Sequence, residues 1–559
     1  MERQHDINKK TAHILKLTLI HTVIGLVCFL LLVSHVLTSD YDGLWYADAA
    51  YQSGAWEISL GRFMIPVIDF FRFALNVEPL QSVLTLAMLA SGSVLLLDLF
   101  SFTDSKFSVP VIMLLCTSPT VCIFLSYRYT APAYGLSYLL AVLSVWMLVK
   151  AERTGSAEAS HPAAASSWLP FAQGERKQRR REILLTAAAA VTLVLTLGTY
   201  QAHLGCACVA ILFYAVYLCM REHTSCKDVF RFLIRSVISG IAACAVYKVI
   251  WDITMNVTKA EVPDYRGAQG LSVVGMLAGL PHGVKQSYRF FYDQFFEAAN
   301  RYNLLQKQPL YMALIGAWVF LAVFLVLYIA KKQGKKGVLA AVLFVVIPVA
   351  CGVVCLLTSE TGFVSMQMTM PYMMVAPLLL VLSAGTPDAL TLFKDAPLAS
   401  KKADRIVLAI LCGLLLYGRI CQTQVDQFVM YEGTKTTERM VSDAVAQAAY
   451  DGLLTEDNKL MFIGVPAENG LFRKSELFEQ ANGYAQFGQF WRGPYVYWRG
   501  YGGLLRRMGV NREVPDLETY VALMELEEVK NMPVYPDAGC MLLKDDVLII
   551  KFANELETD

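Results

Sequence analysis

Charged residues are scarce in this chain, and they are rarest inside its long apolar runs. Asp, Glu, Lys and Arg make up 17% of the 559 residues, whereas 56% of the residues are hydrophobic. Soluble globular domains carry roughly 25% charged residues. Together with a mean hydropathy of +0.45, this composition excludes an ordinary soluble protein and predicts a polytopic membrane protein.

Several other signals are missing from the sequence. The 13 cysteines form no CxxC pair, so no cysteine metal site is indicated. No internal repeat is visible, and no small-x-small cleavage site precedes Asp40. Because the first apolar run is also too long for the core of a signal peptide, we expect it to be a signal anchor.

Eleven apolar runs approach the roughly 20 residues that a membrane-crossing helix needs. The predicted spans are about 15–37, 80–98, 109–127, 133–150, 183–200, 204–220, 236–254, 308–330, 337–357, 370–384 and 405–421. With this arrangement, five clusters of Lys and Arg fall on one side, which the positive-inside rule makes cytoplasmic. The N-terminus is therefore predicted to be cytoplasmic and the C-terminus extracytoplasmic.

The sequence divides into a membrane part, residues 1–421, and an extracytoplasmic tail, residues 422–559. The tail holds 13 basic and 22 acidic residues, a difference of −9, which argues against a nucleic-acid partner. A helix at about 424–452 and strand candidates at 459–465 and 547–552 predict a small α/β or α+β domain. The predicted fold class is mainly α, a transmembrane helical bundle with this small domain attached.

The first long external loop, residues 38–79, concentrates the chemistry-bearing side chains. Its acids are Asp40, Asp42 and Asp48. The segment 56–75 is amphipathic and predicts a helix in the membrane interface, with Arg62 and Arg72 at the level of the lipid headgroups. Arg62 also follows Gly61, where the backbone can approach a ligand, so a binding role is the alternative for this arginine.

Two further external segments carry candidate binding residues. Arg128 lies in a turn crowded by tyrosines, among them Tyr127, whose rings can stack on sugars. The alternative for Arg128 is an interfacial arginine that reaches toward the headgroups between tyrosines. In the second long loop, 255–307, the segment 281–305 predicts another interface helix. Its exposed Arg289 suits either a role in holding the acceptor or a plain tether.

Three short motifs resemble the bacterial Gtr type II glucosyltransferase family. They are the Asp-Gly-Leu step at 42–44, the Gly-Arg pair at 61–62 and the Tyr200-Gln201 pair at the external end of a span. The resemblance covers most of the membrane part. It implies a GT-C class enzyme of the bacterial cytoplasmic membrane, with a loop aspartate as catalytic base and a polyprenyl-phosphate sugar as donor. It also implies that Tyr200 and Gln201 contact substrate.

Sugar transfer from a phosphate carrier needs a base for the acceptor hydroxyl and cations for the departing phosphate. Asp42 is the first candidate for the base because Gly43 allows a sharp turn after it, and Asp40 is the alternative. Arg62 and Arg128 are the candidates for the phosphate, since the guanidinium fork pairs two phosphate oxygens. The three acids of the loop also suit a divalent ion, so a metal requirement stays open.

The predicted function is transfer of a sugar, expected to be glucose, from polyprenyl phosphate to a cell-surface glycan such as an O-antigen, with inversion. The first alternative is a transporter or flippase for a lipid-linked glycan. Such proteins tend to show paired repeats and charges deep in their spans, whereas the polar residues here gather in external loops. The second alternative is a non-catalytic membrane scaffold that presents the acidic tail.

Overall fold

The structure is a computed structural model. It describes residues 2–38, 41–46, 50–156, 170–261, 273–296, 309–357, 366–385, 401–466, 469, 471 and 493–554. The helices are α1 (Glu2–Cys28), α2 (Leu30–Ser34), α3 (Tyr41–Trp45), α4 (Ala55–Ser59), α5 (Ile65–Phe71), α6 (Leu80–Leu99), α7 (Ser108–Cys116), α8 (Pro119–Ser126), α9 (Ala131–Ser156), α10 (Pro170–Thr199), η1 (Gln201–His203), α11 (Leu204–Met220), α12 (Cys226–Thr258), α13 (Val273–Phe296), α14 (Pro309–Gln333), α15 (Lys335–Cys351), α16 (Val354–Leu357), η4 (Met366–Met368), α17 (Met370–Ala384), α18 (Lys401–Tyr450), α20 (Pro494–Arg507), α21 (Leu517–Met524) and α22 (Glu527–Lys530). The strands are β1 (Lys459–Ile463), β2 (Met541–Lys544) and β3 (Val547–Lys551).

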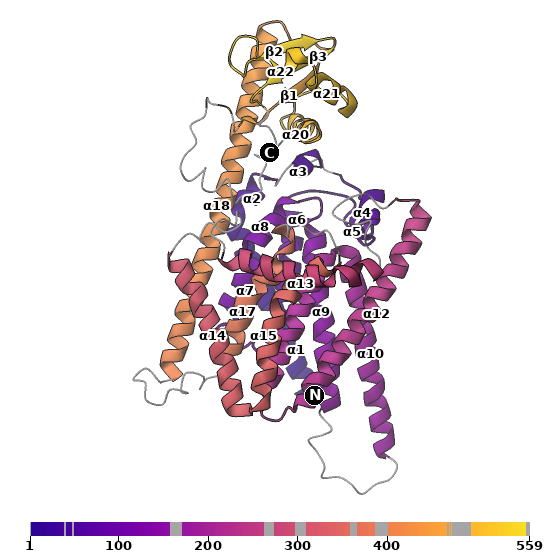
Figure 1. Ribbon diagram of the computed structural model, residues 1–559, viewed down its shortest axis with the longest axis vertical. Helices are drawn as coiled ribbons and strands as arrows, with labels where there is room; N and C mark the ends of the chain where they lie inside the picture. The colour runs from indigo at the N-terminus through magenta and orange to yellow at the C-terminus, as the bar shows by residue number, and fades with distance from the viewer. Residues whose placement is uncertain are drawn as a thin grey trace.

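The molecule is a helical bundle with a small domain at one end (Figure 1). Within the bundle, α9 packs against α6, α10 and α11, and α6 also packs against α1. Helix α13 lies crosswise to α14 and α15 near one end of the bundle (Figure 1) and contacts both α15 and α16. This placement agrees with the predicted amphipathic character of the second external loop.

All eleven predicted spans fall on helices in the structure. Among the described residues, nine helices are long and apolar enough to cross a membrane, which indicates a multi-pass membrane protein. The number becomes ten if α7 and α8 form one broken span, bent by 47°. Pro119 explains the break, because proline lacks the N–H that would continue α7 and favours the first turn of a new helix.

The C-terminal domain is built on α18 and a mixed three-stranded sheet. The strand order is β1-β3-β2, with β1 parallel and β2 antiparallel to β3. Both predicted strands are therefore confirmed, and they pair with each other. The predicted boundary at 421/422 lies inside α18, which runs without interruption from the bundle into the small domain (Figure 1). One helix thus connects the two parts of the protein.

Helix α3, from the first external loop, docks on α20 of the C-terminal domain. Leu44 is buried in the hydrophobic core of that domain. The contact is close, because a Cβ added to Gly503 would lie 2.3 Å from the backbone of Leu44.

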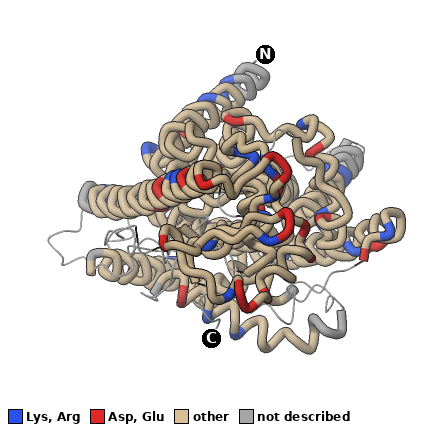
Figure 2. Tube along the Cα trace, turned by 90° about the horizontal axis from the view of Figure 1, so that it is seen from above, with Lys and Arg blue, Asp and Glu red and all other residues tan. Residues whose placement is uncertain are grey.

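Viewed from the side of this domain, acidic and basic residues gather over it, while the surrounding helices carry few charges (Figure 2).

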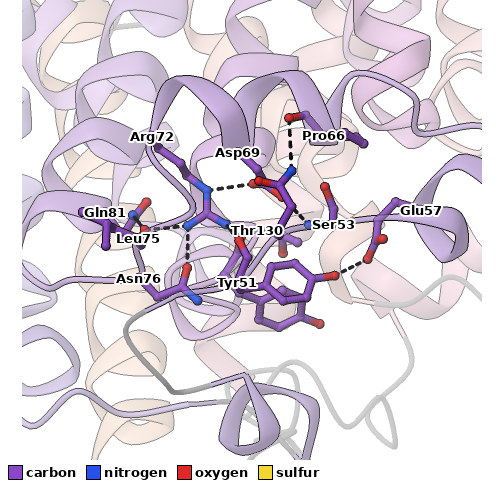
Figure 3. Close-up of polar contacts among 12 residues, drawn as sticks. Tyr51, Ser53, Glu57, Pro66, Asp69, Arg72, Leu75, Asn76, Gln81 and Thr130 are labelled. Atoms are coloured by element: carbon purple, nitrogen blue, oxygen red, sulfur yellow. Dashed lines mark hydrogen bonds and ion pairs between the residues drawn. The ribbon is translucent and has the colours of Figure 1, made fainter.

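The segment 50–76 folds into an irregular loop held by Arg72, not into the single interface helix predicted for 56–75. The helix is broken into α4 and α5, and the Arg72 side chain is only 6% exposed. Its Nε donates to Asp69 at 2.7 Å, and its two Nη atoms donate to Asn76 and to backbone oxygens (Figure 3). The Arg72 side chain thus pairs with Asp69 inside the protein, whereas the single predicted helix would have exposed it; its level relative to the lipid headgroups stays a prediction.

The apolar side of this loop faces outward. Phe70, Phe71 and Phe73 are 72%, 75% and 81% exposed. Such a patch is large for a soluble surface and suits contact with lipid. The predicted amphipathic character is thus retained, although the arginine belongs to the buried side.

Replacement of Arg72 by Ala should destabilise the protein strongly. Asp69, 1% exposed, would lose its cation, and breaking a buried ion pair costs about 3–5 kcal/mol. Arg439→Ala is the matched control, because the pair of Arg439 with Asp443 is largely solvent-exposed. Thermal unfolding of the purified proteins should show a large loss for Arg72→Ala and little change for Arg439→Ala. Equal melting temperatures would contradict the role given to Arg72.

Candidate active site

The predicted base, Asp42, lies in the first turn of α3 and pairs with Arg499 of α20. Arg499 Nη1 is 2.5 Å from Asp42 Oδ1, and Arg499 Nη2 donates to the Tyr46 hydroxyl at 2.8 Å. Burial opposes the charge of Arg499, but Asp42 and then Tyr46 outweigh this effect and raise the pKa of the guanidinium. Asp40 and Asp48 lie outside the described residues, so their roles stay predictions.

Three tyrosine rings join α3 to two other segments of the site. The ring of Tyr46 lies 4.4 Å from that of Tyr51 and 4.9 Å from that of Tyr129, measured between centroids. Arg72 Nη2 donates to the backbone oxygen of Tyr129 at 2.9 Å, which fixes the turn between α8 and α9. Tyr127, a predicted substrate contact, has its ring 6.2 Å from that of Tyr129. The turn that carries Arg128 is therefore held beside α3.

Arg128 is buried in this turn, at 5% exposure. Its Nε has no hydrogen-bond partner among the residues that the structure describes, and neither has Oε1 of the neighbouring Glu78. Burial lowers the pKa of Arg128 to about 10, with Glu78 acting against the shift. Burial likewise raises the pKa of Glu78, opposed by Ser82 and Arg128. Charged groups whose pKa values are strongly shifted by burial and a charged neighbour cluster at functional sites, so this pair is a candidate binding site.

Arg62 is half-buried and lies beside the predicted Tyr200-Gln201 pair. Its guanidinium carbon is 5.4 Å from the centroid of the Tyr200 ring, and its Nε also has no partner in the described part of the chain. Gln201 Nε2 donates to Leu60 O at 2.7 Å and to Tyr247 Oη at 2.9 Å. In this structure the pair therefore supports the turn that holds Arg62.

Gly61 is needed for this packing. Its φ is +78°, and an added Cβ would lie 2.0 Å from Tyr247 Oη. The backbone therefore approaches a neighbouring helix here, whereas the sequence indicated an approach to a ligand.

Arg289, the remaining predicted binding residue, lies on α13. It is 70% exposed and 3.8 Å from Asp293 on the next turn of the same helix. Its predicted role in acceptor binding stays a prediction.

Sequence reasoning missed three charged residues near the site: Glu57, Glu78 and Arg499. Glu57 is 6% exposed and accepts hydrogen bonds from the Tyr51 hydroxyl and from Gly54 N. Burial and then Glu57 raise the pKa of Tyr51. Glu57 lies one residue after Trp56, in a segment otherwise read as interfacial, and Glu78 precedes a proline. Only tertiary packing shows that both are enclosed.

A large apolar cavity of about 430 Å³ lies between α13, α14, α15, α17 and α18. It is half open, and its walls include Trp318, Ala322 and Arg419. Arg419 donates to the backbone oxygens of Leu114 and Met373, whereas Trp318 Nε1 is buried without a partner among the described residues. The cavity therefore suits an apolar chain that carries a polar group.

No group of three His, Cys, Asp or Glu side chains converges for a metal among the described residues. Asp40 and Asp48 are not among those residues, so the predicted divalent ion stays a prediction.

Comparison with known protein families gives a match over much of the chain. The family described as Glucosyl transferase GtrII matches residues 42–382, a range that contains Asp42, Arg62 and Arg128 and ends before α18. No curated protein and no solved structure matches the chain significantly. Because the family match covers more than half of the 559 residues, this chain belongs to the GtrII glucosyltransferase family.

Proposed function

We propose that the protein transfers glucose from a polyprenyl phosphate to a cell-surface glycan, with inversion, on the extracytoplasmic face of the bacterial cytoplasmic membrane. Membership in the family supports glucosyl transfer. The observation that carries the finer proposal is the pair Arg62 and Arg128, each with a buried Nε that has no hydrogen-bond partner among the described residues. Both belong to segments joined to α3, the helix of Asp42, through the tyrosine cluster and the Glu57–Tyr51 hydrogen bond.

The proposed reaction is a single displacement. Asp42 accepts the proton of the acceptor hydroxyl, whose oxygen attacks the anomeric carbon. The bond from that carbon to the phosphate oxygen breaks, and polyprenyl phosphate leaves with the electron pair. Arg62 and Arg128 stabilise the added negative charge on the phosphate, and Arg128 does so more strongly because it is buried and little water competes with it.

The cavity beside α14 supports a lipid-linked donor. Its lining is almost entirely apolar, and three of the helices around it, α14, α17 and α18, are long and apolar enough to cross a membrane. A carrier chain that entered there would bury its apolar surface in the protein instead of the bilayer. The donor phosphate would then reach the end of the bundle that carries α3 and the turn before α9 (Figure 1).

The outward orientation rests on the five basic clusters and places the C-terminal domain outside the cell. Cysteines introduced near Glu525 should react with an impermeant reagent in intact cells, and cysteines near Lys335 should not. The opposite pattern would reverse the proposed face of the reaction.

Asp42→Asn should abolish glucose transfer while donor binding survives. A positioned base contributes about 10²–10⁴-fold to rate, and the amide cannot accept the proton. The measurement is transfer of labelled glucose from polyprenyl-phosphate glucose by the purified full-length protein in lipid. Asp252→Asn is the control, because Asp252 pairs with Lys248 on the exposed side of α12. Asp40→Asn should lose less activity than Asp42→Asn. Wild-type rates in Asp42→Asn would exclude Asp42 as the base.

Ala322→Trp should fill the cavity and raise the KM for a long-chain donor. A short-chain donor should be affected less, because it occupies less of the cavity. Phe320→Trp is the matched control on the same helix, since Phe320 is 60% exposed and does not line the cavity. An unchanged KM for the long-chain donor in a folded Ala322→Trp protein would exclude the cavity as the carrier site.

A further inference from the structure

The residue that contacts the proposed base comes from outside the matched family region. The family match ends at residue 382, whereas Arg499 lies on α20, 457 positions after Asp42. The C-terminal domain therefore reaches the site by folding back over α3. Three arginines of α20 make contacts there, and they differ in what they touch.

Two of these arginines bind mainly backbone oxygens. Arg506 donates to Trp45 O at 2.6 Å and lies over the Trp45 ring. Arg507 donates to the backbone oxygens of His35 and Val36 and also pairs with Glu438. With the burial of Leu44, the Arg506 contact attaches the domain to α3, and the Arg507 contacts attach it to the segment after α2 and to α18.

Arg499 instead holds two side chains with its planar fork. One Nη binds the Asp42 carboxylate and the other binds the Tyr46 hydroxyl, one helical turn further along α3. The side chains of Asp42 and Arg499 are 27% and 18% exposed. Partly exposed ion pairs contribute only about 0–1 kcal/mol to stability, so this pair adds little to docking. The pair instead fixes the position of the Asp42 carboxylate relative to Tyr46, and through Tyr46 relative to Tyr129 and Arg128.

Arg499 also keeps one donor unused. Its Nε is buried and has no hydrogen-bond partner among the described residues. The rings of Trp45, Tyr46 and Tyr495 surround the guanidinium at 5.2–5.7 Å from their centroids. The side chain is thus held in place from several sides.

We propose that Arg499 is a positioning residue, through which the C-terminal domain aligns Asp42 for the transfer step and completes the active site. This inference rests on the proposed function. The C-terminal domain then contributes directly to the transfer step through Arg499. The acceptor hydroxyl must then approach Asp42 at the junction of α3 and α20.

The test compares Arg499→Ala, Arg499→Lys and Arg506→Ala in the full-length protein. Misplacement of a catalytic group by about 1 Å can cost about 100-fold, so kcat of Arg499→Ala should fall by about that factor with the donor KM unchanged. Arg499→Lys should recover part of kcat, because lysine keeps the positive charge but lacks the two Nη donors that bind Asp42 and Tyr46 together. Arg506→Ala removes another arginine contact between α20 and α3, one that does not touch Asp42, and should keep most of kcat.

Crosslinking between cysteines placed on α3 and α20 shows whether the domain stays docked. If Arg499→Ala releases the domain, Gly503→Val provides a second test, because it pushes α20 away from Leu44 while Arg499 is still present. Its kcat should also fall. Wild-type kcat in docked Arg499→Ala, or in undocked Gly503→Val, would overturn the inference. An inactive Asp42→Asn alongside a fully active Arg499→Ala would refute this inference alone, whereas an active Asp42→Asn would refute the proposed base.

Discussion

Arg72 makes five hydrogen bonds in the interior of the outer loop region, and the arrangement of the site depends on them. Its partners are Asp69, Leu75, Asn76, Tyr51 and Tyr129. Asn76 in turn donates to the backbone oxygen of Tyr46, the residue that follows α3. One buried cation therefore ties the first external loop to the turn that carries Arg128 and, through Asn76, to the helix of Asp42. A buried guanidinium tolerates this position only because Asp69 neutralises it.

The site is assembled from two parts of the chain that are far apart in sequence. In the proposed site, the membrane part contributes Asp42, Arg62 and Arg128, and the C-terminal domain contributes Arg499, which contacts Asp42. The long helix α18 spans both parts, so it limits how far the domain can move from α3. The family match ends at residue 382 and therefore does not include Arg499, although Arg499 contacts the proposed base.

The sequence predicted what depends on local composition. Long apolar runs located the helices, because burial of such segments leaves few alternatives. Short apolar runs located β1 and β3. The sequence did not predict that Arg72 pairs with Asp69 inside the protein, because an amphipathic pattern cannot distinguish a headgroup contact from an internal ion pair. The sequence also did not predict the contacts of Glu78 and Arg499. Their surroundings come from segments brought together by tertiary packing, and no spacing rule links position 499 to position 42.

We propose that the donor phosphate binds at the end of the bundle that carries α3, between Arg62, Arg128 and Asp42. A structure of the full-length protein in lipid with a non-reactive phosphonate analogue of polyprenyl-phosphate glucose tests this placement most directly. It should show phosphonate density at Arg62 or Arg128, with the anomeric carbon facing Asp42 and the chain leading into the cavity beside Ala322. Phosphonate density at the opposite end of the bundle, near Lys10 and Asp98, would contradict it.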